Sequence, residues 1–390
     1  MQKQQQNGMT SVLLGLLLAA SFLVGLGDLR AADGPKLLQV CKPKPRDAYD
    51  ELKRYEASHT SMGTEFTVAA YGRDPKFLAE IVEQAFEEID RIDAQMSNYK
   101  PDSELSRINR EAASLAVQVE PSLFALLQKS LQYSEDTGGG FDVTVGPLMK
   151  AWGFFRGQRR VPSAEEIHAV LAHVGYQHVK LDPPARTIHF DVSGIELDLG
   201  GIAKGYAVDR AVAILRENGV TAALVSSGMS SIYALGAPPN EEGWKIVLRE
   251  PFNSSVAADV VYLKNFSMST SGNYNKFFKL GGKTYSHIMN PHTGMPVENI
   301  LSTTVFVATT TDSDALSKLY VLGPEGSRPY LAAHPNIQAL FYLPAKSEKH
   351  FERVLLRSAS YNLRSDAVVK ILQMISFPNS EHPLPRVTKK

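Results

Sequence analysis

Six apolar residues at helical spacing constrain this chain more than any other feature of its sequence. They lie between positions 77 and 96, at Phe77, Ile81, Ala85, Ile89, Ile92 and Met96. This spacing places them on one face of an α-helix, and Asp74-Pro75 supplies an N-cap acid followed by proline at the first helical position. The pattern predicts a long amphipathic helix whose apolar face belongs to the core.

Short β-type segments alternate with further helical patterns along the chain. Further helices are expected at 103–109, after Pro121, from the capping box Ser163–Glu166 to about 174, from the glycine pair at 200–201 to 218, and from Thr309 to before Gly323. Strands are expected at 64–72, 178–182, 187–191, 222–227, 231–236, 244–249, 259–263, 266–272, 302–309 and, as the last strand, 337–344. Helices interleaved with strand clusters predict an α+β fold of one or two tightly joined lobes.

The charge balance excludes one broad class of function. The chain has 390 residues, with 41 Lys and Arg against 41 Asp and Glu. A net charge of zero argues against an electrostatic nucleic-acid binder, which needs a basic surplus. The hydrophobic content of 44% is ordinary for a globular protein with a core.

The N-terminus predicts export. The apolar run VLLGLLLAASFLVGLG at 12–27 precedes small residues at 31–32, which is the pattern of a secretory signal peptide. We therefore expect residues 1–32 to be a cleaved signal peptide and 33–56 to be a linker, with an uncleaved membrane anchor as the alternative. The only cysteine, Cys41, lies well beyond the apolar run, so we do not expect a lipid anchor.

The stretch DLGGIAKGYAVD at 198–209 raises the question of a phosphate site. Two glycines open an expected helix there, and Lys204 lies on its first turn. Free N–H groups and the positive dipole end of a helix favour an anion, which Lys204 could also reach. The spacing fits neither the P-loop nor GxGxxG. The alternative is that the small residues only allow close helix packing, with Asp198 as a simple N-cap.

Three other segments carry candidate functional residues. The glycines at 138–140 allow close backbone approach to a flat or charged ligand, or they form only a flexible loop. His287 precedes the turn NPHTG and could act as a general base, or it is a structural histidine. Asp314 lies in the first turn of an expected helix, where a capping charge is the alternative to a metal ligand.

Four motifs, taken together and in this order, resemble one family. They are MSNYKPDSELSRIN at 96–109, GFDVTVGPL at 140–148, DLGGIAKGYAVD and SHIMNPHTGMP at 286–296. They are similar to the periplasmic FAD:protein FMN transferases, the ApbE family, and the resemblance covers about residues 61–323. It implies an α+β, ApbE-like core related to the T-fold, with mixed sheets and packed helices around a central cofactor cleft. The catalytic domain would span 57–345, and 346–390 would form a C-terminal extension with a disordered end.

The resemblance also implies an activity and a set of site residues. The family binds FAD with Mg²⁺ on its pyrophosphate and transfers the FMN part to a Ser or Thr hydroxyl of a protein, releasing AMP. By matching motifs, the residues implied to bind FAD are Met62, Tyr99, Gly140, Phe141, Asp142, Asp198, Lys204 and Ile288. His287 would be the general base, and Lys204 would offset charge on the phosphoryl oxygens. The Gly201 carbonyl and Asp314 would hold Mg²⁺ through oxygen ligands.

Two positions depart from the family pattern. Lys318 stands where the family has a threonine whose oxygen joins the metal shell, and a lysine ammonium has no lone pair with which to ligate magnesium. We expect that Lys318 either points away, with Ser317 or water completing the shell, or replaces part of the metal's charge. Met229 stands where the family has a second glycine, so its side chain could narrow the cleft or change the backbone geometry.

Two other functions stay open beside FMN transfer. An FAD diphosphatase would use the same cleft with water as the acceptor. A non-catalytic flavin-binding protein would result if Lys318 and Met229 have degraded the metal site, although His287 and Asp314 are intact. The expected partners are FAD and an acceptor redox protein with a Ser/Thr flavinylation motif, and no nucleic acid. We expect a periplasmic location, with peripheral association with the inner membrane as an option.

Overall fold

The fold is that of a computed structural model, which describes residues 52–156, 159–273, 277–346, 350–362 and 366–373. All of them belong to one compact unit of the chain, residues 47–390. The expected signal peptide, Cys41, most of the expected linker and the end of the C-terminal extension lie outside the described residues. The first strand already begins at Lys53, so the last residues of the expected linker belong to the fold.

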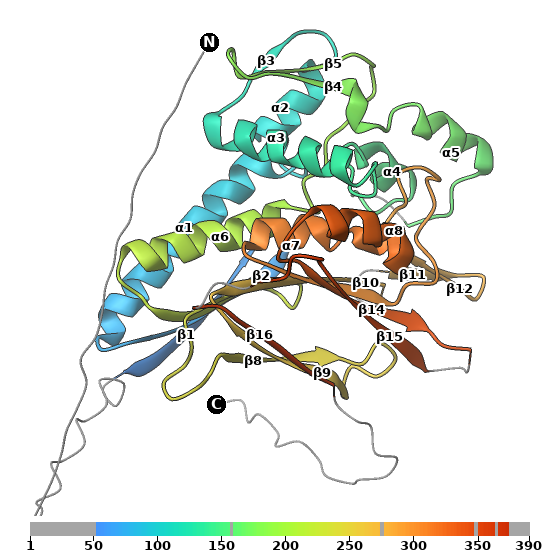
Figure 1. Ribbon diagram of the computed structural model, residues 1–390. Coiled ribbons are helices and arrows are strands. Elements are labelled where there is room, and N and C mark those ends of the chain that lie inside the picture. Colours follow the sequence, from blue (N-terminus) through green and yellow to red (C-terminus); the bar gives the residue numbers. More distant parts are fainter. Residues whose placement is uncertain (1–51, 157–158, 274–276, 347–349, 363–365, 374–390) are drawn as a thin grey trace, which may run out of the picture. The chain divides into compact units, whose positions relative to one another are not determined.

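The described residues form one large sheet of eight strands (Figure 1). Its order is β1-β2-β6-β7-β10-β13-β14-β15, and each of these neighbours pairs antiparallel. The strands are β1 (Lys53–Ser61), β2 (Thr64–Gly72), β6 (Ala222–Ser227), β7 (Ser231–Leu235), β10 (Phe266–Gly272), β13 (Ser302–Val307), β14 (Gln338–Pro344) and β15 (Phe351–Arg357). Strand β13 is buried along its whole length, as expected for a strand with layers on both faces.

Helices cover one face of the large sheet, and a small sheet covers the other (Figure 1). The helices are α1 (Pro75–Met96), α6 (Ala203–Glu217), α7 (Thr310–Leu316) and α8 (Leu319–Ala333). The small sheet has the order β16-β9-β8, with β8 (Trp244–Arg249), β9 (Ala257–Lys264) and β16 (Val368–Gln373). Val305 belongs to the core under the helices and Phe306 to the core under the small sheet. This alternation is what the two-residue period of a strand requires.

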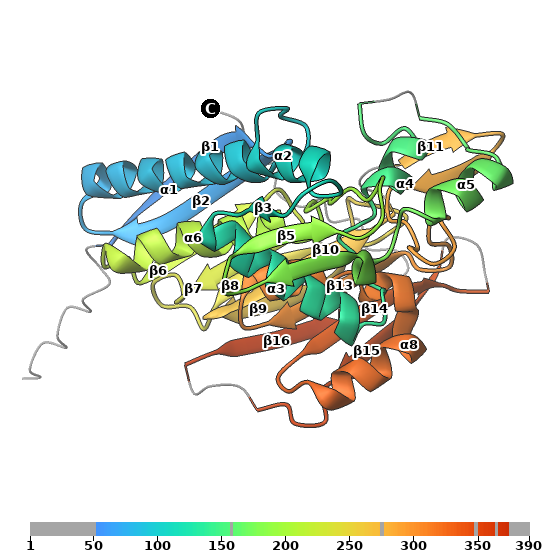
Figure 2. The same ribbon diagram turned by 90° about the horizontal axis from the view of Figure 1, so that it is seen from above.

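Most of the remaining elements lie beyond the helical layer, whereas the hairpin of β11 (Phe277–Leu280) and β12 (Lys283–Ser286) lies beside the large sheet (Figures 1 and 2). The others are α2 (Glu104–Glu111), α3 (Pro121–Asp136), α4 (Gly146–Ala151), α5 (Ala164–Leu171), the 3₁₀ turn η1 (Tyr176–His178), and the sheet of β3 (Val117–Gln118), β5 (Thr187–Phe190) and β4 (Val179–Asp182). The α+β class is confirmed. The sheets expected to be mixed are antiparallel in every pairing between the described strands.

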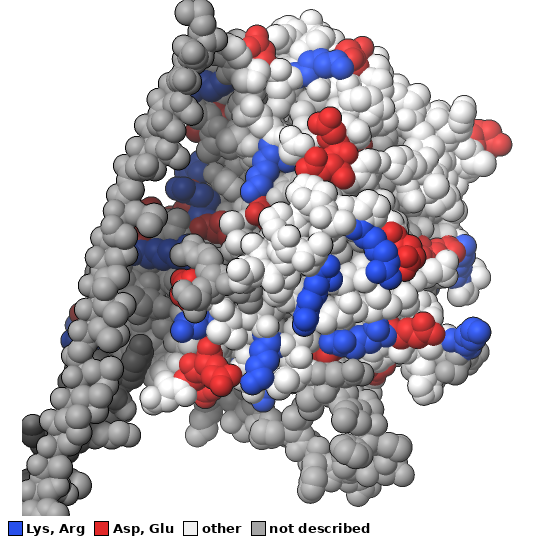
Figure 3. All heavy atoms as spheres, viewed as in Figure 1, with Lys and Arg blue, Asp and Glu red and all other residues white. Residues whose placement is uncertain are grey.

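The surface charges agree with the balanced composition. On the face shown in Figure 3, acidic and basic side chains are interspersed instead of gathering into a field of one sign. Among the described residues, no helix is both long and apolar enough to span a membrane.

The long amphipathic helix is confirmed with one correction. Asp74 caps α1 by accepting hydrogen bonds from the backbone N–H groups of Lys76 and Phe77, and Pro75 is its first residue. The expected apolar face is buried from Ile81 onward, but Phe77 is 43% exposed. Periodicity alone could not show this, because Leu78 takes the buried place in the first turn.

The C-terminal part departs most from the expectations. The strand at 337–344 is not the last, because β15 extends the large sheet and β16 pairs with β9. The helix expected from Thr309 to before Gly323 is two helices, since α7 ends at the C-cap Ser317 and α8 continues through a kink at Gly323. Of these features, only the pairing of β16 with β9 joins segments far apart in the chain, which local patterns do not report.

Asp209, the last residue of the glycine motif, joins α6 to α7. Its carboxylate accepts hydrogen bonds from Thr310 N at 2.8 Å and Thr311 N at 2.7 Å, so it caps the start of α7. We expect Asp209→Ala to lower the free energy of unfolding by about 2–4 kcal/mol, because two backbone donors lose a charged acceptor in a partly buried place. Urea unfolding followed by circular dichroism measures this. The exposed cap variant Asp74→Ala should cost only about 1 kcal/mol, and equal losses would contradict the role given to Asp209.

Candidate functional site

Segments far apart in the sequence meet at the N-terminus of α6. Asp198 N donates to Val143 O at 2.7 Å, and Asn98 Nδ2 donates to Asp198 Oδ2 at 3.1 Å. Gly201 faces the ring of Phe141, since a Cβ on this glycine would lie 3.2 Å from Phe141 Cε2. Three of the motifs singled out in the sequence are therefore in direct contact.

The two glycines form a turn that is held by Asp198 and flanked by two lysines. Gly200 N donates to Asp198 Oδ1 at 2.7 Å, so this carboxylate orients the turn. Lys204 Nζ donates to Gly200 O at 2.6 Å, and Lys318 Nζ donates to Gly201 O at 3.4 Å. Two consecutive carbonyls each meet an ammonium group. This concentration of positive charge favours binding of an anion.

Lys318 is partly buried beside Asp314, whose side chain is almost fully enclosed. Besides Gly201 O, Lys318 Nζ donates to Asp314 O at 3.1 Å and to Ser317 Oγ at 3.0 Å, and it lies 3.6 Å from Asp314 Oδ1. Burial lowers the pKa of Lys318 to about 8; the Asp314 carboxylate opposes this shift and the nearby Lys204 adds to it. The break between α7 and α8 falls at this residue, where the C-terminal carbonyl groups of α7 favour a cation.

Gly205 and Asp314 bring α6 and α7 into close contact. Gly205 N donates to Asp314 Oδ2 at 2.9 Å, and a Cβ on Gly205 would lie only 2.2 Å from Thr310 O. Of the two readings that the sequence left open for the motif 198–209, close helix packing is present, and anion binding stays a prediction. Gly205 allows close helix packing, whereas the turn at 200–201 presents its carbonyl groups to the two ammonium groups.

The oxygen atoms expected to bind Mg²⁺ are brought together, but around Lys318. Magnesium needs near-octahedral oxygen ligands at about 2.0–2.1 Å, and an ammonium offers no lone pair. Two unit charges 4 Å apart repel by about 4 kcal/mol at an effective dielectric constant of 20, and a divalent ion doubles that cost. The donor set of Gly201 and Asp314 thus fits the ammonium of Lys318 and does not fit a magnesium ion beside it. Within the described ranges, no group of three or more His, Cys, Asp or Glu could hold a metal.

Two aromatic rings lie together next to the residue that contacts Asp198. The rings of Tyr99 and Phe155 lie 4.6 Å apart between centroids, and Tyr99 is 45% exposed. Tyr99 follows Asn98, which donates to Asp198, and burial together with the negative charge of Asp198 raises the pKa of Tyr99. Exposed aromatic faces suit stacking with a flat heterocycle. Phe155 was not found from the sequence, because only the fold brings it to Tyr99.

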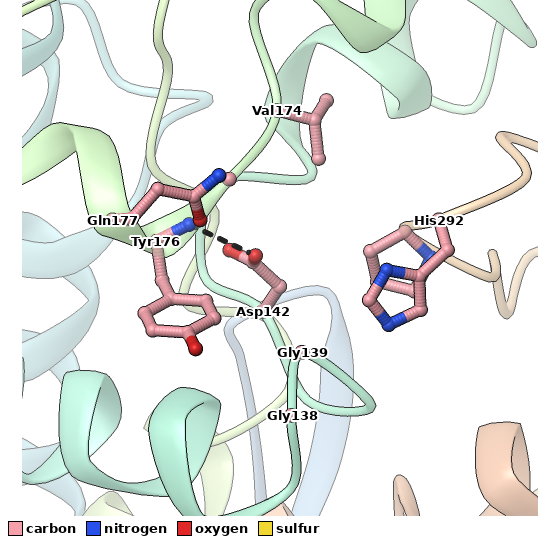
Figure 4. A pocket seen from close by; sticks show the side chains of 9 residues that line it. Gly138, Gly139, Asp142, Val174, Tyr176, Gln177 and His292 are labelled. Atoms are coloured by element: carbon pink, nitrogen blue, oxygen red, sulfur yellow. Dashed lines mark hydrogen bonds between the residues drawn. The ribbon is translucent and has the colours of Figure 1, made fainter.

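A pocket of about 330 Å³ lies beside Asp142 and the glycines at 138–139. It is lined by Gly138, Gly139, Asp142, Val174, Gly175, Tyr176, Gln177, Pro291 and His292. Asp142 accepts hydrogen bonds from Thr144 N at 2.8 Å and Tyr176 N at 3.0 Å, yet burial raises its pKa. Figure 4 shows Asp142 between Tyr176 and His292, which face each other across the pocket.

Gly139 and Gly140 are required for close approach of neighbouring side chains, whereas a Cβ on Gly138 would have open space. A Cβ on Gly139 would lie 2.9 Å from His292 Cε1, and one on Gly140 would lie 2.7 Å from Leu322 Cγ. The loop of His292 and the start of α8 therefore pack directly on this turn. His292 lies within a motif that the sequence singled out, but its place at the pocket is visible only in the fold.

The segment with His287 packs on the start of α8 through Ile288 and Tyr320. His287 is partly buried and follows β12, with its ring 6.4 Å from that of Phe154. Its neighbour Ile288 is buried and packs in a cluster with Ile300 and Tyr320, two residues beyond Lys318. The side chain of Ile288 therefore supports the fold of this loop.

Met62 and Met229 lie in adjacent turns of the large sheet. Met62 occupies the β1–β2 turn with φ 51° and packs on the main core, and Met229 is 57% exposed in the β6–β7 turn. Gly228 N donates to Glu65 O at 2.6 Å, which joins the two turns. Among the described contacts, none connects either methionine to the glycine turn at 200–201.

Comparison with known proteins places the chain among flavin transferases. The model of the ApbE family matches residues 62–341. The FAD:protein FMN transferase of Escherichia coli is 32% identical over 325 residues, which cover 81% of this chain and 88% of that protein. The crystal structure of the ApbE protein from Thermotoga maritima is similar with a TM-score of 0.70 at 31% identity, over 79% of this chain and 97% of that one. The flavin transferase ApbE from Vibrio cholerae gives 0.69 at 29% identity, over 80% and 98%.

Proposed function

The chain belongs to the ApbE family, and on that premise we propose that it is an FAD:protein FMN transferase, an enzyme that transfers FMN from FAD to a protein. The observation that carries the proposal is the double-glycine turn, whose consecutive carbonyls bind the ammonium groups of Lys204 and Lys318. FAD carries a pyrophosphate between two flat ring systems. The turn offers positive charge for the pyrophosphate, and the Tyr99–Phe155 pair offers a stacking surface beside it.

The proposed reaction is a phosphoryl transfer to a hydroxyl group. The oxygen of a Ser or Thr hydroxyl on the acceptor bonds to the phosphorus atom of the FMN half. The bond from that phosphorus to the bridging oxygen breaks, and its electron pair leaves with AMP. The hydroxyl proton passes to a ring nitrogen of His287, because a neutral hydroxyl is a poor nucleophile without a nearby base.

Two lysines would stabilise the negative charge that develops during the reaction. Lys204 and Lys318 would contact the pyrophosphate and offset the charge that develops on departing AMP. Asp198 would position the turn through Gly200 N, and Asp142 would hold the backbone at Tyr176, which lines the pocket. The magnesium ion implied by the resemblance does not fit beside Lys318, so we assign no step to it.

The products formed with and without an acceptor test the proposal. The full chain is incubated with FAD, with or without a protein substrate of the Escherichia coli relative, and AMP and free FMN are separated by chromatography. We expect AMP release that depends on the acceptor, with little free FMN. Equal AMP and FMN regardless of acceptor would identify a diphosphatase, and bound FAD without AMP would identify a flavin-binding protein.

The location of the reaction is a further part of the proposal. The apolar run at 12–27 supports export to the periplasm with cleavage near residues 31–32. The acceptor would then be an exported or membrane-associated redox protein. Mass spectrometry of the N-terminus of the exported protein tests this, and retention of residues 1–32 would contradict it.

A further inference from the structure

We propose that the ammonium of Lys318 takes the place of a divalent metal ion at the FAD pyrophosphate, so that this chain binds and cleaves FAD without metal. This inference rests on the proposed function and adds a property of its site. The evidence for it is the set of oxygen atoms that surround Lys318 Nζ.

The position of the ammonium group is the first step of the argument. Lys318 Nζ lies within 3.6 Å of oxygens from Gly201, Asp314 and Ser317. Carbonyl, carboxylate and hydroxyl oxygens are the donors that a hard cation takes. In this chain, the ammonium group of Lys318 already lies beside these oxygens.

The surroundings hold this lysine in place. Ser317 Oγ donates to Asp314 O at 2.7 Å and pairs with Ser271 Oγ at 2.7 Å, so the hydroxyl has partners of its own besides Lys318. Asp314 Oδ2 accepts from Gly205 N at 2.9 Å, which leaves Oδ1 as the carboxylate oxygen facing the ammonium. Of the two expectations for Lys318, this arrangement agrees with replacement of the metal's charge and not with a side chain that points away.

The ammonium groups of Lys204 and Lys318 are the positive charges that this turn offers to a pyrophosphate. The carboxylates of Asp198 and Asp314 lie at the same turn and balance them. A divalent ion at the same oxygens would have to displace the ammonium, because both cations need the Gly201 carbonyl and Asp314 Oδ1.

The wild-type chain provides the first test, and it needs no variant. FAD binding to the full chain is measured by quenching of flavin fluorescence, after chelation of metals, in EDTA and in Mg²⁺. We expect dissociation constants that agree closely in the two buffers and, once an acceptor protein is added, AMP release in both. FAD binding that is about tenfold or more weaker in EDTA, as expected for loss of a charge-assisted contact, would overturn the inference.

Lys318→Thr provides the second test, because it restores an oxygen donor and removes the ammonium. We expect this variant to acquire a metal requirement: weak FAD binding in EDTA and recovery in Mg²⁺. Titration of Mn²⁺ followed by electron paramagnetic resonance gives a readout independent of turnover, with Mn²⁺ bound by the variant in the presence of FAD and not by the wild type. Lys318→Met, which offers neither charge nor oxygen, should bind FAD weakly in both buffers.

The controls separate this inference from the proposed function. Lys370→Thr removes one positive charge from an exposed site on β16 that pairs with Glu242, and it should leave FAD binding independent of metal. A Lys318→Thr variant that binds FAD equally well in EDTA and Mg²⁺ would overturn the inference. Metal-independent binding by the wild type without any AMP would instead refute the transferase, while the role of Lys318 in FAD binding would stand.

Discussion

Replacing His287 with alanine should lower the rate of FMN transfer by about 10²–10⁴-fold, the usual contribution of a general base. FAD affinity should change little, because the pyrophosphate contacts proposed here come from α6 and the start of α8. The measurement is the rate at which the acceptor gains flavin, together with the FAD dissociation constant of the same variant.

A second histidine variant serves as the control for this effect. His168 lies exposed on α5, and His168→Ala should transfer FMN at the wild-type rate. Acceptor modification by His287→Ala at a rate near that of wild type would assign the base to another group. A parallel loss of FAD binding would point to a role of His287 in the fold of its loop.

Gly205→Ala should lower the free energy of unfolding by about 3 kcal/mol or more. Helix propensity alone predicts the opposite sign, since alanine in a helix is favoured over glycine by about 1 kcal/mol. The steric term is larger, because the added Cβ would lie 2.2 Å from Thr310 O and 2.7 Å from Asp314 Cβ. Overpacking of this kind forces backbone shifts, here between α6 and α7. Thermal and urea unfolding measure the change.

Ala213→Gly calibrates this result within the same helix. Ala213 is partly buried on α6, and its replacement should cost only about 1 kcal/mol through helix propensity. A Gly205→Ala variant that is as stable as wild type would show that α6 and α7 can move apart. The oxygens around Lys318 Nζ would then be held less firmly than their contacts indicate, because one of them belongs to Asp314 on α7.

Local elements were predictable where the sequence alone decides them. Asp74-Pro75 marked the start of α1, and the capping box of Ser163 and Glu166 marked α5, because caps depend on residues within one turn. Strand β16 was missed because its pairing partner, β9, lies far away in the sequence, whereas β15 was missed although it pairs with β14, the strand directly before it. A strand whose partner lies about a hundred residues away leaves only a weak local signal.

The candidate site, like the fold, could be predicted only in part from the sequence. The motifs pointed to Asp198, Asp142 and Lys204, and the fold brings their segments together through Val143, Phe141 and the double-glycine turn. The sequence also marked Lys318 as a departure, but it left open where the side chain points. That answer depends on the break between α7 and α8, which local patterns did not predict.

Other contributors to the site had no usable signal in the sequence. Phe155 and Tyr176 lie outside the motifs and reach the site only through the fold. Asn98 and His292 lie inside quoted motifs, but nothing in the order of residues distinguishes them from their neighbours. Their roles follow from one hydrogen bond to Asp198 and one close approach to Gly139.

The mass of the acceptor protein after incubation with FAD tests the central claim most directly. Intact-mass spectrometry, followed by peptide mapping, reads the covalent product itself. The account predicts a gain of one FMN moiety on a single Ser or Thr hydroxyl of the acceptor with the wild-type chain, and its loss with His287→Ala. An acceptor of unchanged mass, while FAD is converted to free FMN and AMP or remains bound, would contradict it.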